Sequence, residues 1–370
     1  MSAAQKTPRQ AGAKLIRLKK QQGVAIITAV LLTALAITIV GNLFWQQNVQ
    51  LRMVENQQLK QKTRWIVVGG LDGVRLLLNE DLKHSQSDDL TEIWATPIAE
   101  IRLDTFLERN EDATDVGNAA ISGQITDASS FYNLENLASN RVIDKYEVGV
   151  LKKLMLNLRI NPSLADTLAT AVASSQKLAV VVPNNPNNPP QPNQPNQPNQ
   201  PNQPNQPQQP NPPAGTGNPA AANGTPLPAT PGKEPAPIAD VGDLIALPGF
   251  TPEIVSTLKK FVIVLPRQNG ALTTVNINTA SAEVLSARID TLSLSQAKSI
   301  ILARERTPYR DMANFWANNH ITSKPEYNLD IKSEFFLAKS HARIDHADLE
   351  SIALVHRTSA GTRVLWIREI

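Results

Sequence analysis

The longest apolar run of the chain lies near its N-terminus. Residues 24–40 read VAIITAVLLTALAITIV without a charge, and Gly41 to Trp45 extend this run to an aromatic end. About 20 apolar residues in a helix span the roughly 30 Å of a bilayer core, where tryptophan favours the interface. The pattern predicts a transmembrane helix, and the proline-free stretch 46–82 predicts that this helix continues beyond the membrane.

Apolar residues recur at roughly helical spacing along that continuation and predict an apolar stripe. Gly69, Gly70 and Gly73 interrupt the stretch, each at a cost of about 1 kcal/mol relative to alanine in a helix. We therefore predict one long helix over 24–82 that is weakened near these glycines. The stripe consists of Leu51, Val54, Leu59, Trp65, Val68, Leu71 and Val74.

The pattern changes further along the chain. Residues 118–137 alternate like a strand and then become rich in Asn and Leu, residue types that cap and turn a backbone. Residues 142–160 and 164–182 predict two helices, separated by Asn161 and Pro162.

A proline-rich tract follows these helices. Between Pro192 and Pro210 proline recurs at every third residue, with Asn and Gln between. That period matches the three residues per turn of polyproline II, and such a composition cannot form a packed core. We predict an extended linker over about 183–237.

Apolar periodicity returns beyond residue 239. Residues 243–266 and 275–316 each resemble a helix-hairpin-helix unit, and Asn278, Thr279 and Ser281 are suitable N-cap residues in the second. Beyond them, the alternation predicts three strands joined by short polar turns, which make an antiparallel sheet. In the last strand we expect Val364 and Trp366 on one face, with Leu365 and Ile367 on the other. The strands are expected over 333–344, 350–358 and 362–370.

Charge is distributed unevenly. Six basic residues lie within positions 1–22, and the first acidic residue is Glu55. By the positive-inside rule this places the N-terminus in the cytoplasm and sends the rest across the membrane. The net charge of only +3 provides no global field for binding nucleic acid. The six are Lys6, Arg9, Lys14, Arg17, Lys19 and Lys20.

Candidate chemistry is sparse. The absence of cysteine excludes disulfides, thiolate metal sites and a cysteine nucleophile. No Gly-x-Ser-x-Gly, P-loop or His-Glu-x-x-His motif occurs, and the histidines lack metal-ligand spacing. Asp345, His346 and Asp348 could bind a cation, although a turn between strands explains them better. We predict that the protein is not an enzyme and has no cofactor. The histidines are His84, His320, His341, His346 and His356.

The junction between the basic head and the apolar run is informative. Gln21, Gln22 and Gly23 precede a sudden apolar start at Val24. This resembles a type IV prepilin signal, which implies cleavage between Gly23 and Val24 and N-methylation of Val24. An ordinary signal anchor also fits the length and charge. A cleaved secretory signal fits less well, because its small residues, Ala34 and Ala36, lie inside the run.

Several features together resemble the K-type minor pseudopilin of type II secretion. Prepilins usually carry Glu at the fifth mature position, which here is Thr28, and this departure is typical of the K type. Residues 132–137, YNLENL, resemble its strand-to-helix segment. The two hairpin units and the terminal strands follow in the same order.

The resemblance implies an α+β fold: a long N-terminal transmembrane helix, a pilin-like domain with an antiparallel sheet, and an inserted helical domain of the helix-hairpin-helix or SAM-like kind. It also implies that the protein caps the pseudopilus tip in the inner membrane, with a periplasmic globular part. The implied partners are minor pseudopilins of types I and J, other pseudopilins and the prepilin peptidase. The implied segments are 1–23 (leader), 24–82 (helix), 83–137 and 326–370 (pilin-like domain), and 138–325 (insert, interrupted by 183–237).

Calcium is associated with this family, but the sequence lacks its Trp-Ile-Asp-x-Asp segment and offers no Asp-x-Asp loop as ligands. The metal ligands are therefore unknown.

Two other functions remain open. Helix-hairpin-helix units often bind DNA through glycine amides, which would suit a membrane-tethered DNA-uptake protein. Here residues 292–295, Leu-Ser-Leu-Ser, replace the phosphate-binding glycines, so we expect no nucleic acid partner. Nearby Lys298, Arg304, Arg306 and Arg310 are expected to form a solvated helix face. A tip subunit of a type IV pilus would share the prepilin signal.

Overall fold

A computed structural model of the protein describes residues 22–103, 118–176, 236–268 and 270–370. The chain divides into two units, Met1–Lys62 and Thr63–Ile370. A single 63-residue helix, α1 (Gln22–His84), runs through both. The predicted long helix is therefore present, and glycines 69, 70 and 73 do not interrupt it. The predicted linker falls almost entirely on residues 177–235, outside the described residues.

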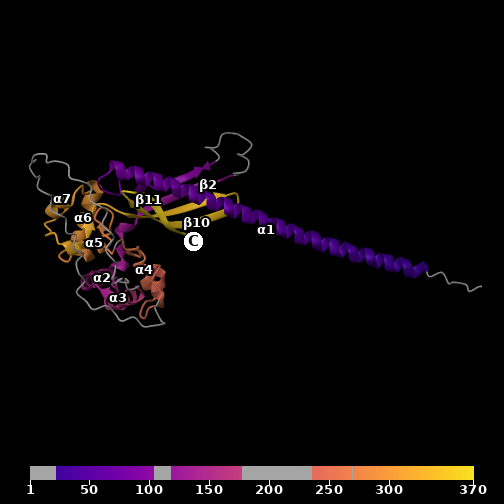
Figure 1. The fold of residues 1–370 in the computed structure, drawn as a ribbon, viewed down its shortest axis with the longest axis horizontal. Helices are drawn as coiled ribbons and strands as arrows, with labels where there is room; N and C mark the ends of the chain where they lie inside the picture. Colours follow the sequence, from indigo (N-terminus) through magenta and orange to yellow (C-terminus); the bar gives the residue numbers. More distant parts are fainter. Residues whose placement is uncertain (1–21, 104–117, 177–235, 269) are drawn as a thin grey trace, which may run out of the picture. The chain divides into compact units, whose positions relative to one another are not determined.

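The second unit is built on a five-stranded antiparallel sheet in the order β1-β2-β9-β10-β11, with α1 along one face (Figure 1). Alternate residues of the central strands point towards the helix. Phe336, Ala338 and Ala342 of β9 pack with Ala353 and Val355 of β10 on this side. The strands are β1 (Ile98–Arg102), β2 (Ala120–Asp127), β9 (Phe335–Ile344), β10 (Ala347–Thr358) and β11 (Gly361–Glu369).

The side of α1 that packs on the sheet differs from the predicted stripe. Leu71 and Val74 are buried as part of it, but Trp65 is 72% exposed and Val68 is 40% exposed. The packed positions are spaced by three or four residues, which places them on one side of a helix with 3.6 residues per turn. Trp65 lies two residues before Val67 and so points elsewhere. The packed positions are Thr63, Val67, Leu71, Val74 and Leu78. Of the other predicted members, Leu51 and Val54 are exposed in the first unit and Leu59 is partly buried.

A long insertion separates β2 from β9 and has its own apolar core. Its two predicted N-terminal helices are present but shorter than expected. The first ends before Arg159, which has a positive φ of 60°. Residues 177–182 of the second lie outside the described residues. The insertion begins with η4 (Ala128–Ser130), β3 (Tyr132–Asn133), η5 (Leu134–Leu137), β4 (Ala138–Ser139), β5 (Val142–Ile143), α2 (Lys145–Asn157) and α3 (Leu164–Ser175).

The two hairpin units make up the rest of the insertion. Ser281 is the N-cap of α5, as predicted, because its hydroxyl accepts a hydrogen bond from the Val284 amide. The elements are η6 (Val241–Ala246), α4 (Pro252–Leu258), β6 (Val262–Ile263), β7 (Val275–Asn276), α5 (Ala282–Arg288), α6 (Leu294–Arg306), α7 (Met312–Asn318), η7 (Pro325–Tyr327) and β8 (Leu329–Asp330). A further short element, η1 (Ile93–Ala95), follows α1. The expected α+β fold is confirmed, whereas the exact domain boundaries stay a prediction.

The last strand corrects one expectation. Leu354 pairs with Trp366 and Val355 pairs with Val364, so Leu365 is an extra residue in a β-bulge. The bulge reverses the alternation within β11. Val364 therefore packs towards α1, while Leu365 and Trp366 both pack on the opposite side of the sheet.

Candidate functional site

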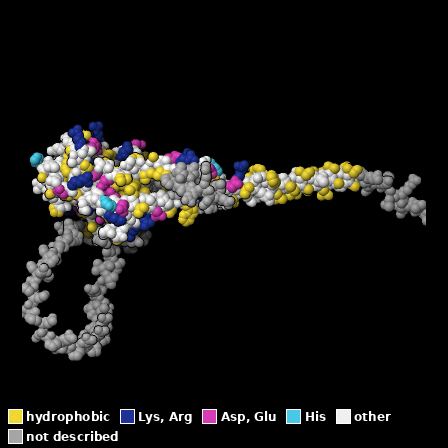
Figure 2. Space-filling view, turned by 90° about the horizontal axis from the view of Figure 1, so that it is seen from above, with side chains coloured by type: hydrophobic (Ala, Val, Ile, Leu, Met, Phe, Trp, Pro, Cys, Tyr) yellow, Lys and Arg dark blue, Asp and Glu magenta, His cyan; other side chains and the backbone are white. Residues whose placement is uncertain are grey.

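The first unit offers an apolar helix surface. The side chains of residues 24–50 are all exposed, and Figure 2 shows hydrophobic groups along this rod. The helix from Val24 is long and apolar enough to cross a membrane. Together with the family assignment below, this helix supports membrane anchoring.

The predicted processing residues lie at the start of this helix. Gly23 and Val24 are in the first turn, and Thr28 follows one turn later. The Thr28 hydroxyl donates to the carbonyl oxygens of Val24 (3.1 Å) and Ala25 (3.0 Å). Its polar group is therefore satisfied within the helix, and unlike a carboxylate it needs no counterion in lipid.

In the second unit, α1 has an exposed apolar face. Trp65, Val68 and Leu76 are exposed at 72%, 40% and 70%, on the side away from the sheet. Gly69 and Gly73 lie between them at helical spacing, and a Cβ at either position would meet no atom within 4 Å. We call these five residues the outer face of α1. Because each glycine weakens a helix and neither is needed for packing inside this chain, the outer face is suited to close approach by another helix.

Gly70 has a different role. A Cβ at Gly70 would collide with Cδ1 of Ile121 on β2. Its missing side chain therefore lets α1 lie close to the sheet. Gly69, Gly70 and Gly73 lie close together in the sequence. Only the structure shows that Gly70 packs against the sheet, whereas Gly69 and Gly73 lie on the outer face.

A buried polar cluster joins the sheet to the insertion. Asp127, at the end of β2, accepts hydrogen bonds from Thr279 Oγ1 (2.5 Å) and Ser333 Oγ (2.6 Å). Asn276 Nδ2 donates to Asp127 Oδ2 (3.1 Å) and to the carbonyl oxygen of Asp88 (3.0 Å). Asp88 follows the C-terminal end of α1, so both ends of the insertion meet the end of that helix.

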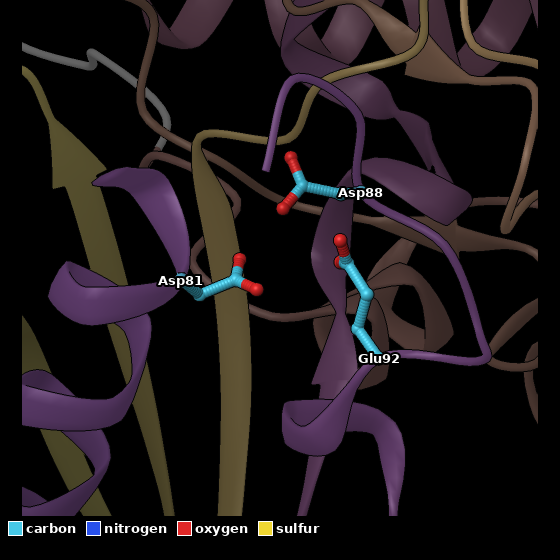
Figure 3. Close-up of side chains that lie close together, drawn as sticks. All are labelled: Asp81, Asp88 and Glu92. Carbon is cyan, nitrogen blue, oxygen red and sulfur yellow. The ribbon is translucent and has the colours of Figure 1, made fainter. Parts of the chain in front are cut away.

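Three carboxylates cluster beside this junction (Figure 3). Each of Asp81, Asp88 and Glu92 has an oxygen within 4.8 Å of the others. Burial and the neighbouring Glu92 raise the pKa of Asp81 to about 6, although Arg357 acts in the opposite direction. Arg357 donates to Asp81 Oδ2 (2.7 Å) and to Asp88 Oδ1 (2.5 Å).

This cluster does not fit a calcium site. Calcium requires six to eight oxygen ligands, and here the carboxylate oxygens face N–H donors instead. Glu92 Oε2 accepts from the indole of Trp94 (2.7 Å) and from the Asp89 amide (3.2 Å), while the Arg357 guanidinium bonds the two aspartates. Arg357 acts as the counterion in this part of the described structure.

The second hairpin unit is capped by side chains. Ser293 is the N-cap of α6 and forms a reciprocal capping box with Gln296. The Ser293 hydroxyl accepts a hydrogen bond from the Gln296 amide, so this amide does not face a phosphate. Arg304 does not belong to a solvated face. It is 5% exposed and donates to the carbonyl oxygens of Ile277 and Ala280. The pattern of charges along α6 could not show that this one cation turns inward to bind backbone.

The Asn-rich segment after β2 is structural. Asn133 caps η5 as expected and also bonds Leu265 through both ends of its amide, at 3.0 and 2.9 Å. Asn136 makes the same paired contact with Thr273. The histidines are dispersed among the described residues. His341 pairs with Asp348 at 2.5 Å, whereas buried His356 stacks on Phe335.

Comparisons with known proteins identify the family. Two family models described as "Type II secretion system (T2SS), protein K" match residues 130–267 and 275–332, together just over half of the chain. No curated protein sequence matches.

One solved structure is similar over 86% of this chain and 99% of the matched chain, with a TM-score of 0.53 and 16% identity. It is described as the GspK-GspI-GspJ complex from the enterotoxigenic Escherichia coli type 2 secretion system. At this identity the likeness concerns the fold, which agrees with the family models. The chain therefore belongs to the protein K family of the type II secretion system and is a minor pseudopilin.

Proposed function

We propose that this minor pseudopilin caps the tip of the pseudopilus with minor pseudopilins of types I and J and helps to initiate its assembly. The observation that carries the proposal is the place where the insertion joins the sheet. The chain leaves the sheet after Asp127 and returns at Ser333, and the Ser333 amide donates to Asp88 Oδ2 (2.7 Å) just beyond α1. The insertion is thus attached at the end of the sheet where α1 ends.

Attachment at this end favours a terminal position. In a helical filament every interior subunit has neighbours both above and below it. A subunit added beyond the C-terminal end of α1 would collide with the insertion, whereas α1 itself stays accessible to subunits beneath. Growth beneath the cap would then promote protein export across the outer membrane.

The outer face of α1 is the proposed contact with partner pseudopilins. Exposed tryptophan is frequent among the residues that dominate binding energy, and glycines allow two helices to approach closely. Arg64 and Asp72 lie beside this face and supply a polar rim, with Arg64 paired to Glu369 at 2.6 Å. The K-type resemblance and the complex of the similar structure support partners of types I and J.

Gly69→Leu should lower the recovery of types I and J with the full chain at least several-fold, because its side chain fills the space needed by a partner helix. Folding should be unharmed, since nothing lies within 4 Å of a Cβ at Gly69, and leucine favours helix by about 1 kcal/mol. Co-expression of the three proteins, affinity purification and thermal unfolding measure both effects.

Gly149→Leu is the matched control, since Gly149 is an exposed glycine of α2 that also has nothing within 4 Å. It should leave recovery unchanged. Wild-type recovery with Gly69→Leu would exclude the outer face as the contact. A chain that stays alone under every condition would count against tip capping itself.

We further propose that prepilin peptidase cleaves between Gly23 and Val24 and that Val24 is then N-methylated. The basic head supports a cytoplasmic N-terminus at the inner membrane and a periplasmic globular part. Because α1 begins at Gln22, the peptidase must unwind its first turn, and glycine makes this easier. Thr28 suits a subunit that has no neighbour beyond it, because it presents no buried carboxylate to neutralise.

Mass spectrometry of the purified chain should therefore show an N-terminus at methylated Val24. Gly23→Leu should retain residues 1–23, because leucine favours the helix and obstructs the peptidase. Gly41→Leu, in the same helix and with nothing within 4 Å, should still be processed. A wild-type chain that begins at Met1 would rule out this processing.

We also propose a structural role without catalytic activity, resident cofactor or nucleic acid partner. Two observations support it. Arg357 donates hydrogen bonds to the carboxylate cluster where a metal ion would lie. Ser293 and Gln296 form a capping box at the position where phosphate-binding hairpins carry glycine.

A further inference from the structure

Asp127 gathers hydrogen bonds from several segments. Its Oδ1 accepts from the Ser129 amide at 2.7 Å, and its Oδ2 accepts from Asn276, Thr279 and Ser333 at 3.1, 2.5 and 2.6 Å. Asn276 and Thr279 belong to the insertion, and Ser333 lies where it returns to the sheet. Asp127 is 1% exposed, so water cannot replace these partners.

Apolar packing also joins the insertion to the sheet. The core of the insertion and the core between α1 and the sheet are separate clusters among the described residues. A third cluster lies between them. Leu265 and the partly buried Ile263 of the insertion pack there with sheet residues, and its other members are Ala128, Phe335, Leu337, Leu354, Leu365 and Trp366. The polar groups around Asp127 contribute to the attachment together with Arg368 of β11, which pairs with Asp240 of the insertion at 2.9 Å.

Charge at the junction is unbalanced. Asp127 lies close enough to Asp88 for repulsion to act on it, and Asp81 and Glu92 lie beyond Asp88. Arg357 already pairs with Asp81 and Asp88. Arg304 of α6 interacts electrostatically with Asp127, but its N–H groups donate hydrogen bonds to backbone carbonyl oxygens. One more negative charge is therefore costly here.

We infer that Asp127 is a proton-dependent latch that holds the insertion on the sheet, and that the latch is tighter when its carboxyl group is protonated. Burial raises the pKa of Asp127 to about 6 and Asp88 adds to this, although the hydrogen bonds from Ser333, Thr279 and Ser129 act in the opposite direction. Opening the junction exposes Asp127 to water, where its pKa returns to about 3.9. The closed state then binds the proton more tightly, so closure is favoured as pH falls from about 6 towards 4.

Asp81 contributes little to this opening. Its neighbours Glu92, Asp88 and Arg357 all lie on the α1 and sheet side of the junction, so its surroundings stay the same when the insertion moves. The latch is independent of the proposed position at the filament tip.

Hydrogen exchange of the full purified chain tests the latch. The amides of Ser333 and Asp88, which bond across the junction, report its opening. After correction for intrinsic exchange rates, their protection should be about tenfold greater at pH 5 than at pH 7, given a pKa of about 6 closed and about 3.9 open. Asp127→Asn should abolish this dependence, because asparagine does not titrate.

Two further variants complete the test. Ser333→Ala removes one donor to Asp127 and should reduce protection at both pH values without unfolding the chain. Asp166→Asn, at an exposed carboxylate of α3, should keep the tenfold dependence. Undiminished pH dependence in Asp127→Asn, or unchanged protection in Ser333→Ala, would overturn the proposal. If Asp127→Asn fails to fold, Ser333→Ala and the wild-type pH series still decide it.

Discussion

Replacing Arg288 by methionine should lower the free energy of unfolding by roughly 3–5 kcal/mol, because it leaves a buried carboxylate without its counterion. Arg288 Nη1 and Glu147 Oε2 are 2.6 Å apart, and both side chains are fully buried in the core of the insertion. Burial lowers the pKa of Arg288, but the attraction of Glu147 outweighs it and leaves the pKa raised. Urea unfolding of the full chain, followed by circular dichroism, measures the loss.

The double variant Glu147→Leu with Arg288→Met should recover most of that loss. The pair is not fully satisfied, since Glu147 Oε1 and Arg288 Nη2 have no hydrogen-bond partner. Apolar side chains of similar volume avoid the cost of burying both charges. If the double variant is as unstable as the single one, packing rather than charge explains the loss.

Lys152→Met is the matched control on the same helix, α2. Lys152 pairs with Asp166 at 2.8 Å, but the two side chains are 41% and 59% exposed. Exposed pairs contribute about 0–1 kcal/mol, so this change should have little effect. An equal loss in Lys152→Met and Arg288→Met would contradict the role of burial.

The sequence was most informative where a pattern was long or repeated. The uncharged run 24–40 and the proline-free stretch after it predict α1, and the alternation after Ser333 predicts β9, β10 and β11. These elements satisfy their own hydrogen bonds or pair with adjacent strands, so local pattern determines them. The short strands β3 and β7 pair with the distant β6 and β8, and no local signal announces them.

Side-chain direction was harder to predict than the presence of an element. Trp65 and Val68 are apolar at helical spacing, yet they lie on the outer face because the sheet selects Val67 and Leu71. A single extra residue, Leu365, separates Val364 from Trp366. Spacing alone cannot reveal which of several apolar faces has a partner within the chain, or where a bulge will fall.

Polar residues that act at long range carried no local signal. Glu147 and Arg288 are far apart in the sequence and each could belong to an exposed helix face. Asp127 lies within the strand-like stretch 118–137, but its hydrogen-bond partners Asn276, Thr279 and Ser333 are distant in the sequence. Such clusters depend on the insertion folding back onto the sheet. The processing residues Gly23, Val24 and Thr28 stay predictions from the sequence.

Arg357→Met should cost about 3–5 kcal/mol at pH 7, because Arg357 is the counterion of Asp81 and Asp88 and also bonds the carbonyl oxygen of Ser333 at 2.9 Å. The loss should be smaller at pH 5. The pKa of Asp81, already raised to about 6, rises further without the guanidinium, so the folded state takes up a proton that the unfolded state, with a pKa near 3.9, does not.

The same variant should acquire calcium dependence. Without Arg357, Asp81 and Asp88 face no guanidinium, although Glu92 Oε2 still accepts from Trp94 and from the Asp89 amide. One oxygen from each of the three carboxylates, all within 4.8 Å of one another, can then share a divalent cation whose remaining ligands are water. Millimolar calcium should therefore raise the thermal midpoint of Arg357→Met and leave the wild-type chain unchanged. Arg306→Met, at an exposed arginine of α6, should respond to neither calcium nor pH 5. A calcium response of the wild-type chain equal to that of Arg357→Met would show that Arg357 is not what occupies the cluster.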